Sequence, residues 1–367
     1  MNIQKLNLTH FRNFESASFS FDPETVHVLY GRNAQGKTNL LESIYFLSHL
    51  RSFRTKKLPS LMERGQNDFR IECELETRGR TEELAAAFSA NKKHLFRYSN
   101  PVGSYSSFVG ILNAVLFCPD DLNLFSLSPA VRRQFMDMEL VKLSRSYTST
   151  LSHYQKLLKE RNLVLKERVP DKTLAFTYSD LMAKDQAVLI AQRAEFLRRL
   201  EQEANQLLPF FSRKDQEVLR IRYITCTDPE GDIEQDLKSQ YEKDWQQDAF
   251  RHYTRTGAHK DDIEFYLNDV LLTQTASQGQ KRTVLLCLKL ALTRLIKEAK
   301  GEYPILLLDD VFSELDVLRR IQLIRQIPEA MQVFITTTEL IPPEWFDRPA
   351  RFYTVDHGVM KEGIFDV

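Results

Sequence analysis

The sequence has no excess of charge of either sign: 50 Lys and Arg residues are matched by 50 Asp and Glu residues. A neutral chain has no general attraction to nucleic acid or to an acidic membrane surface, so such binding must come from local clusters. Cysteine is also scarce, and its four residues are far apart and form no C-x-x-C pair. This spacing argues against a zinc site and a disulfide framework, and we expect a reduced, cytoplasmic environment.

Long apolar runs are missing as well. The first residues contain no secretory apolar core, and the strongest apolar run, residues 284–292, is interrupted by Lys289 and is too short to span a bilayer. Membrane insertion is therefore not expected. The 367 residues are nevertheless 43% hydrophobic and 11% aromatic, enough to bury a large core in more than one compact unit.

One motif fits the Walker A pattern G-x-x-x-x-G-K-[ST]; with the residue after it, it comprises Gly31, Arg32, Asn33, Ala34, Gln35, Gly36, Lys37, Thr38 and Asn39. Its glycines let backbone amides surround phosphates, Lys37 meets the β/γ charge, and Thr38 binds Mg²⁺. A buried strand is predicted over residues 25–30 and a helix over 39–47, which places the phosphates at a helix N-terminus. The alternative is a glycine-rich surface turn.

A second motif is the apolar run from residue 303 that ends in Asp309 and Asp310. This is a Walker B arrangement, in which Asp309 holds Mg²⁺ directly or through water. Asp310, which we assign with Lys37 to catalysis, then orients the attacking water or accepts its proton. Alone, the run also fits a buried strand that leads into a helix cap.

Two shorter motifs accompany the Walker pair. Residues 313–316 have the form of the D-loop of ABC-type ATPases, with Ser313 and Asp316 as its polar positions. A long helix is predicted to run to Lys300, and it opens with Ser277, Gln278, Gly279 and Gln280. These four residues resemble the ABC signature, which binds the γ-phosphate held by the opposite subunit. By itself, a polar helix start that begins with serine is common.

Between the Walker motifs the pattern changes. Residues 69–76 alternate apolar and polar side chains, and with residues 81–98 they predict a small antiparallel sheet. Residues 130–169 and 173–208 contain no proline or glycine and predict two long antiparallel helices, the second ending before Pro209. In the second helix the predicted packing seam contains Leu174, Tyr178, Leu181 and Val188. Residues 218–225 predict a strand, and the acidic residues 228–248 predict a solvated connection.

Several polar residues have more than one interpretation. A basic run is placed either on DNA phosphates or in a solvated loop; its cations are Arg51, Arg54, Lys56 and Lys57. Arg12 is predicted to be solvated. His259, Asp261 and Asp262 suggest a metal site, but adjacent aspartates point to opposite faces of an extended chain, which disfavours a two-metal nuclease.

The order of these motifs resembles the SMC family and its bacterial recombinational-repair relatives with a short helical insertion. The resemblance covers essentially the whole chain and depends on residues 33–39, 51–55, 117–121, 128–129, 132–133, 155–162, 256–262 and 277–280. It implies an α/β fold: an ABC-type ATPase head with an attached antiparallel sheet and a helical hairpin insertion. Residues 1–115 and 255–367 would form the two halves of the head, and 116–254 the insertion.

The resemblance also implies a function. It implies a weak, DNA-dependent ATPase with ATP and Mg²⁺ as cofactors, whose ATP-driven homodimer clamps duplex and gapped DNA in recombinational repair, replication restart and the SOS response. Its mediator partners would be RecR and RecO, it would help to load the RecA recombinase, and it would be cytoplasmic and associated with the nucleoid. Asp310 replaces the usual glutamate, Gln278 replaces a glycine, and residues 336–338 lack a switch histidine, so we expect slow turnover. A transport ATPase and a protein-only adaptor are the alternatives.

Overall fold

The computed structural model describes residues 1–212 and 216–363. The chain folds into two compact units, which we name the sheet unit (residues 1–121 and 285–367) and the helical unit (residues 122–284). Residues 255–284, which the sequence-based division assigns to the second half of the head, belong to the helical unit. That division into functional domains remains a proposal.

The centre of the sheet unit is a six-stranded sheet with the order β15-β14-β3-β13-β12-β8. Its strands are β3 (Val26–Tyr30), β8 (Ala114–Phe117), β12 (Ile305–Asp309), β13 (Val333–Thr337), β14 (Ala350–Asp356) and β15 (Val359–Glu362). All neighbours are parallel except β14 and β15. β8, β12 and β13 are buried along their whole length, which explains their continuous apolar sequence. The predicted strands over 25–30 and before Asp309 are confirmed.

A second sheet of the same unit is antiparallel, with the order β2-β1-β4-β5-β6-β7. Its strands are β1 (Asn2–Phe11), β2 (Phe14–Ser20), β4 (Asp68–Thr77), β5 (Arg80–Ser89), β6 (Lys92–Arg97) and β7 (Asn100–Pro101). In β4, Phe69, Ile71, Cys73 and Leu75 are buried while the residues between them are not, so the predicted alternation is confirmed. Helix α1 (Lys37–His49) contacts β5 of this sheet and β8, β12 and β13 of the central sheet.

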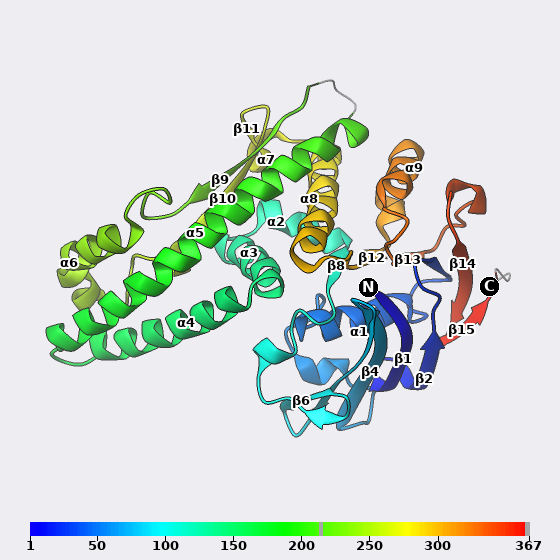
Figure 1. Ribbon diagram of the computed structural model, residues 1–367, viewed down its shortest axis with the longest axis horizontal. Helices are drawn as coiled ribbons and strands as arrows, with labels where there is room; N and C mark the ends of the chain where they lie inside the picture. Colours follow the sequence, from blue (N-terminus) through cyan, green and yellow to red (C-terminus); the bar gives the residue numbers. More distant parts are fainter. Residues whose placement is uncertain (213–215, 364–367) are drawn as a thin grey trace. The chain divides into compact units, whose positions relative to one another are not determined.

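The helical unit contains long helices and a three-stranded sheet of order β11-β10-β9 (Figure 1). Its helices are α2 (Asn123–Ser126), α3 (Pro129–Leu143), α4 (Arg145–Leu165), α5 (Lys172–Phe211), α6 (Ile233–Arg251) and α7 (Leu272–Thr275). Its strands are β9 (Leu219–Ile224), β10 (Asp262–Leu267) and β11 (Val270–Leu271). Helix α8 (Gln278–Lys300) begins in this unit and continues into the sheet unit. No helix in the part of the chain that the structure describes is long and apolar enough to span a bilayer.

Two helix boundaries differ from the prediction. The single helix expected over 130–169 is interrupted at Ser144, which has φ −130° and whose Oγ accepts the N–H of Tyr147 at 3.1 Å as the N-cap of α4. Pro209 lies inside the last turn of α5 instead of ending the helix. So close to the helix end, a proline removes one backbone hydrogen bond and has few later turns to disturb.

The predicted seam of α5 and the predicted acidic connection were both wrong. Leu174, Leu181 and Val188 are 41%, 40% and 41% exposed, and the buried face is displaced by about one residue. That face contains small and polar side chains, so hydrophobicity identifies it poorly; it includes Ala175, Ser179, Met182, Ala183, Gln186, Leu189 and Ile190. The acidic stretch contains α6, in which Leu237 and Tyr241 are fully buried one turn apart.

Candidate nucleotide-binding site

The predicted phosphate loop lies between β3 and α1, as the sequence indicates. Gly31 and Gly36 have φ angles of 154° and 113°, which L side chains rarely adopt. A Cβ at Gly31 would come within 2.5 Å of the Val355 carbonyl oxygen, and one at Gly36 within 2.8 Å of Asn13 Nδ2. Glycine is therefore required at both positions, and the backbone between them curls with its amides at the start of α1, where phosphate binds favourably.

Lys37, the first residue of α1, directs its ammonium back into this loop. Its Nζ donates to the carbonyl oxygen of Gly31 and, at 2.9 Å, to that of Arg32. Burial lowers the pKa of Lys37, while the charges of Asp310 and Asp309 oppose that shift. The ammonium is thus a positive charge, poorly solvated and close to both carboxylates, that a phosphate anion would stabilise.

Asp309 ends β12 beside the phosphate loop. Its Oδ1 accepts hydrogen bonds from the Thr38 hydroxyl at 2.7 Å and the Thr336 hydroxyl at 2.8 Å. Burial raises the pKa of the Asp309 carboxyl, and the hydrogen bonds from both threonines act in the opposite direction. The structure therefore brings together Thr38 and Asp309, the two predicted metal ligands.

Sequence reasoning missed Thr336 as a partner of this site. It is the next-to-last residue of β13, which lies between β3 and β12 in the sheet, and the register pairs it with Asp309. Its Oγ1 also accepts the backbone N–H of Asp310 at 3.0 Å. Only sheet order could have revealed this role, because Thr336 lies 27 positions after Asp309 in the chain.

Asp310 and the D-loop residues follow directly. Asp310 has φ 51° and precedes a 3₁₀ turn over Val311–Glu314, and Ser313 Oγ donates to its carbonyl oxygen at 2.7 Å. Asp316 caps helix α9 (Val317–Gln326), where its side chain accepts the N–H of Arg319 at 3.1 Å. Asp310 is therefore held in a conformation that aspartate tolerates better than most residues.

The donor set around Asp309 fits Mg²⁺. A hydroxyl and a carboxylate are the hard oxygen ligands that this ion prefers, and Mg²⁺ takes few protein ligands because water and substrate phosphates complete its octahedron. Residues 1–212 and 216–363 contain no cluster of three or more His, Cys, Asp or Glu side chains that could hold a metal by themselves.

The predicted basic run follows α1 and is attached to it. Arg54 Nη1 donates to Asn39 Oδ1 at 2.8 Å and lies 3.7 Å from the buried carboxylate of Glu42. Arg12, which we predicted to be solvated, instead binds both oxygens of Glu42 at 2.8 Å. That prediction was wrong because its partner lies 30 residues away in the chain.

The structure places a second basic segment beside this run. Lys92 and Lys93 begin β6, and Lys93 Nζ donates to the Leu50 carbonyl oxygen at 2.6 Å, immediately before Arg51. Burial, and then the charge of Arg51, lower the pKa of Lys93. Two cationic segments about forty residues apart therefore meet on the sheet unit, which the sequence did not indicate.

The predicted signature residues lie in the helical unit. Ser277 precedes α8, and its Oγ accepts the N–H of Gln280 at 3.2 Å, while Gln280 Oε1 accepts the N–H of Ser277 at 3.1 Å. This reciprocal pair is a capping box. Ser277 is exposed at this helix N-terminus.

His259, Asp261 and Asp262 do not converge on a common point. Asp261 accepts a hydrogen bond from Arg193 at 2.7 Å, whereas Asp262 accepts two from Arg132 at 2.6 and 2.8 Å. His259 Nδ1 lies 2.7 Å from the Tyr154 hydroxyl. These contacts join α3, α4 and α5 to the segment of residues 259–262 within the helical unit.

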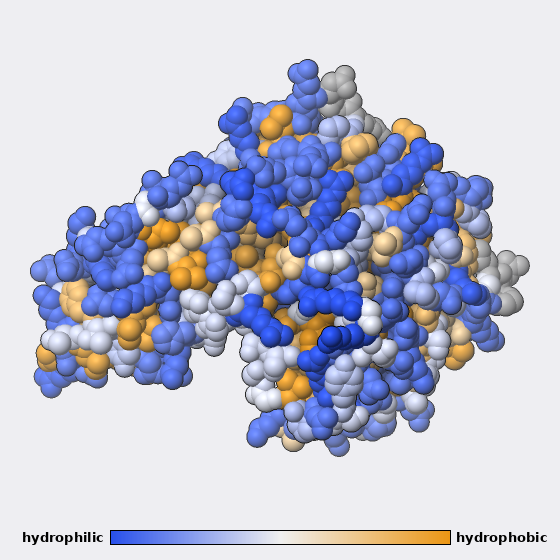
Figure 2. All heavy atoms as spheres, in the orientation of Figure 1, coloured by the Kyte–Doolittle hydropathy of each residue, from blue (hydrophilic) through white to orange (hydrophobic). Residues whose placement is uncertain are grey.

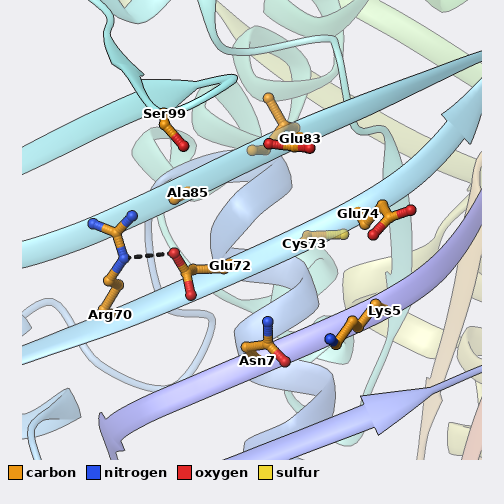
Figure 3. A pocket seen from close by; sticks show the side chains of 10 residues that line it. Lys5, Asn7, Arg70, Glu72, Cys73, Glu74, Glu83, Ala85 and Ser99 are labelled. Atoms are coloured by element: carbon orange, nitrogen blue, oxygen red, sulfur yellow. Dashed lines mark hydrogen bonds and ion pairs between the residues drawn. The ribbon is translucent and has the colours of Figure 1, made fainter.

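A separate hollow of about 180 Å³ lies on the antiparallel sheet, where β1, β4 and β5 contribute its lining (Figure 3). Arg70 and Glu72 form an ion pair of 2.8 Å across part of it, and Lys5, Glu74 and Glu83 surround the rest. No residue of the phosphate loop lines this hollow, so it is distinct from the nucleotide site.

Three features define an ABC-type ATPase head. They are a phosphate loop after β3, a carboxylate at the end of β12, which is one strand away from β3 in the sheet, and an antiparallel sheet in the same unit. Residues 2–361 match the family model for the RecF/RecN/SMC N-terminal domain. The DNA replication and repair protein RecF of Latilactobacillus sakei subsp. sakei (strain 23K) is 38% identical over 388 residues, covering 99% of both chains. The chain belongs to the RecF family, which confirms the resemblance to the repair relatives of SMC proteins.

Solved structures agree with this assignment. The recombination mediator protein RecF, solved with ATP in the RecFOR pathway, is 29% identical, with a TM-score of 0.90 over 99% of this chain and 97% of that chain. The Smc head domain from Pyrococcus furiosus, at 15% identity and a TM-score of 0.58 over 98% and 95% of the chains, shares the fold. The predicted fold class, and the prediction of an ATPase, are confirmed.

Proposed function

We propose that the protein is an ATP-dependent DNA-binding protein of recombinational repair and replication restart. The observation that carries the nucleotide part is the 2.7 Å hydrogen bond between Thr38 and Asp309, which joins the Walker A and Walker B segments. The RecF relatives support the repair context. ATP would lie on residues 31–39, and Mg²⁺ would be held by Thr38 and Asp309 and would neutralise phosphate charge when bound.

The chemistry proposed for the chain's own residues follows from their positions. Lys37 leaves the carbonyl oxygens of Gly31 and Arg32 to bind the β- and γ-phosphates. Asp310 orients the attacking water and accepts its proton. Aspartate reaches one methylene less far than the glutamate usual in ABC ATPases, so we expect hydrolysis to be slow and to act as a reset.

We propose that ATP drives formation of a homodimer. Ser277 to Gln280 of one chain would complete the site that contains Lys37 of the other, with Ser313 and Asp316 at the same contact. The surface next to the D-loop supports this, because Val317 and Leu318 are 53% and 73% exposed on α9. Exposed apolar side chains at a helix start favour burial against a partner.

For DNA we propose the surface made by the two basic segments of the sheet unit. Arg51, Lys56 and Lys57 belong to one segment, and Lys92 and Lys93 to the other. Cations that pair with phosphates release condensed counterions, which gives strong, salt-dependent affinity. Arg54 was also predicted to bind DNA, and its side chain contacts Asn39 and Glu42 of α1. Loading of RecA, with RecR and RecO as partners, is part of the same proposal.

The first experiment is fluorescence anisotropy of labelled gapped duplex DNA, titrated with and without Mg-ATP, for wild type and Lys37→Ala. We expect tight binding that needs ATP and disappears in the variant. Sedimentation should show a dimer with Mg-ATP; only monomer at micromolar protein would reject the composite site. DNA binding independent of ATP would make the phosphate loop a partner switch. No DNA binding at all would favour the adaptor or transport alternatives.

A second experiment tests the surface. Lys92→Gln with Lys93→Gln should weaken DNA binding and reduce the slope of log K against log salt by about 0.9 for each phosphate that the variant no longer neutralises. The matched control is Lys5→Gln with Lys361→Gln, which removes two exposed cations of the same unit outside both segments. An equal weakening of DNA binding in the two double variants would show a general charge effect and reject this surface.

A further inference from the structure

Glu42 is a carboxylate with no solvent exposure, on α1, one helical turn after Thr38. Arg12 binds both of its oxygens at 2.8 Å, and the Ser52 hydroxyl donates to Oε1. A buried charge is tolerated only when charged or polar donors satisfy it. Glu42 therefore fixes three segments around one side chain: the turn between β1 and β2, helix α1, and the basic run after α1.

Ser52 connects Glu42 to the backbone of the basic run. Its Oγ accepts the backbone N–H groups of Arg54 at 2.9 Å and Thr55 at 3.0 Å. The Arg54 side chain then returns to α1 through its 2.8 Å hydrogen bond to Asn39. Both the backbone of the basic run and the Arg54 side chain are therefore connected to helix α1 by hydrogen bonds.

Asn39 connects the same helix to the phosphate loop. Its Nδ2 donates to Asn13 Oδ1 at 2.8 Å, and Asn13 Nδ2 donates to the carbonyl oxygen of Gln35 at 3.3 Å. A continuous series of hydrogen bonds thus leads from the phosphate loop through Asn39 and Arg54 to the basic run. The buried carboxylate of Glu42 lies beside this series, 3.7 Å from the Arg54 guanidinium.

We propose that Glu42 transmits the state of the nucleotide site to the DNA-binding surface; the inference rests on the proposed function. A phosphate would draw Lys37 from the carbonyl oxygens of Gly31 and Arg32, and the first turn of α1 would adjust. Asn39 lies in that turn and Glu42 lies one turn after it, so the run held by Ser52 follows the helix. A ligand shifts such an equilibrium only through contacts that differ between its states, and the bonds of Lys37 are those contacts.

The coupling must act in both directions. If nucleotide raises DNA affinity by some factor, DNA raises nucleotide affinity by the same factor. Glu42→Gln keeps the size of the side chain but removes the charge that holds Arg12, so the factor should fall toward one. Ser52→Ala removes one hydroxyl from the same connection and should lower the factor without a buried charge left unpaired on Arg12.

The chain offers a matched control in Glu82 of β5. Its side chain is buried, and Arg97 binds its two oxygens at 2.7 and 2.6 Å, as Arg12 binds Glu42. Glu82 contacts neither α1 nor the basic run through any of these bonds. Glu82→Gln is therefore the same chemical change, made in a more exposed ion pair that does not bond to α1 or to residues 51–57.

The test measures the Kd of labelled gapped duplex DNA with and without Mg-ATPγS, together with the Tm of each variant. For wild type we expect the two Kd values to differ by about tenfold or more, for Glu42→Gln by less than about twofold, and for Glu82→Gln as in wild type. Ser52→Ala should give a reduced ratio and decides the matter if Glu42→Gln does not fold.

Wild-type ratios in both Glu42→Gln and Ser52→Ala would overturn the inference and leave the proposed function intact. Equal reductions in Glu42→Gln and Glu82→Gln would also overturn it, because loss of stability alone would then explain the effect. Wild-type protein that binds DNA equally with and without nucleotide would instead reject the proposed function, and the inference with it.

Discussion

The Thr336 hydroxyl donates a 2.8 Å hydrogen bond to Asp309 Oδ1 and accepts one of 3.0 Å from the Asp310 backbone, so one side chain orients both Walker B carboxylate residues. Partners of this kind commonly tune metal affinity by about 10–100-fold. The ends of two neighbouring strands thus form one unit around the expected metal position. The face of the molecule drawn in Figure 2 is largely hydrophilic, whereas Thr336 is buried.

We therefore predict that Thr336→Val reduces the advantage that Mg²⁺ gives to ATP binding by about tenfold, measured as the ratio of ATP Kd values in EDTA and in Mg²⁺. Thr337→Val is the control, because Thr337 is also buried in β13 but bonds to the Glu339 backbone. Both variants should lose similar stability. An unchanged ratio in Thr336→Val would show that Asp309 needs no help from β13.

The assignment of Asp310 as the base predicts a specific kinetic result. Asp310→Asn should keep nucleotide binding, slow single-turnover hydrolysis by about 10²–10³-fold and leave the Mg-ATP dimer intact in sedimentation. Asp347→Asn, an exposed aspartate of the same unit, should hydrolyse ATP as wild type does. If Asp310→Asn is as fast as wild type, another group activates the water.

His27 gives the sheet unit a dependence on pH. Burial against neighbours such as Phe334 lowers its pKa to about 4, and the Asp22 carbonyl oxygen, 3.1 Å from Nε2, opposes this shift. Between pH 6.5 and 4 the unfolded chain takes up a proton that the folded chain does not, so stability falls as pH falls, by about 3 kcal/mol in all. Above pH 6.5 this group has no effect.

Urea unfolding at pH 7, 6, 5 and 4 would measure that fall in stability. His27→Phe should flatten the curve over this window, whatever its stability at pH 7. His357→Gln, at an exposed position, should follow wild type. Parallel curves for wild type and His27→Phe would contradict the shifted pKa.

Gly257 is buried in the helical unit, and its neighbours leave no space for a larger residue. It has φ 133°, and a Cβ there would overlap Gln186 Oε1 and come within 3.1 Å of the Tyr154 and Tyr241 hydroxyls. Gly257→Ala should lower the free energy of unfolding by roughly 2–4 kcal/mol, because the cost of backbone strain adds to the cost of disrupted hydrogen bonds. Gly231 has an ordinary backbone conformation, and a Cβ there would make only van der Waals contacts. Gly231→Ala should therefore change the free energy of unfolding by less than about 1 kcal/mol. Thermal unfolding compares the two.

Much of the fold was readable from the sequence because its signals are local. The phosphate loop needs glycines at fixed spacing, β4 alternates because one of its faces is buried, and β12 is wholly apolar because both of its faces are. The helix of residues 233–251 was missed because an acidic composition concealed two buried residues, Leu237 and Tyr241. The seam of α5 was misplaced because its buried face uses alanine and polar side chains where exposed leucines looked more apolar.

The sequence by itself determined the motifs of the proposed nucleotide site: the glycines of the phosphate loop, the carboxylates that end the apolar strand, and the helix that follows the loop. These properties depend on neighbours within one turn or one strand. Only the tertiary structure decided that Thr336 completes the Asp309 contact, that Arg12 is bound to Glu42, and that Lys93 lies beside Arg51. Those contacts depend on strand order and on loops that bring distant segments together. The hydrogen bonds behind them join residues 27 to 43 positions apart, and contacts over such separations leave no periodic pattern in the sequence.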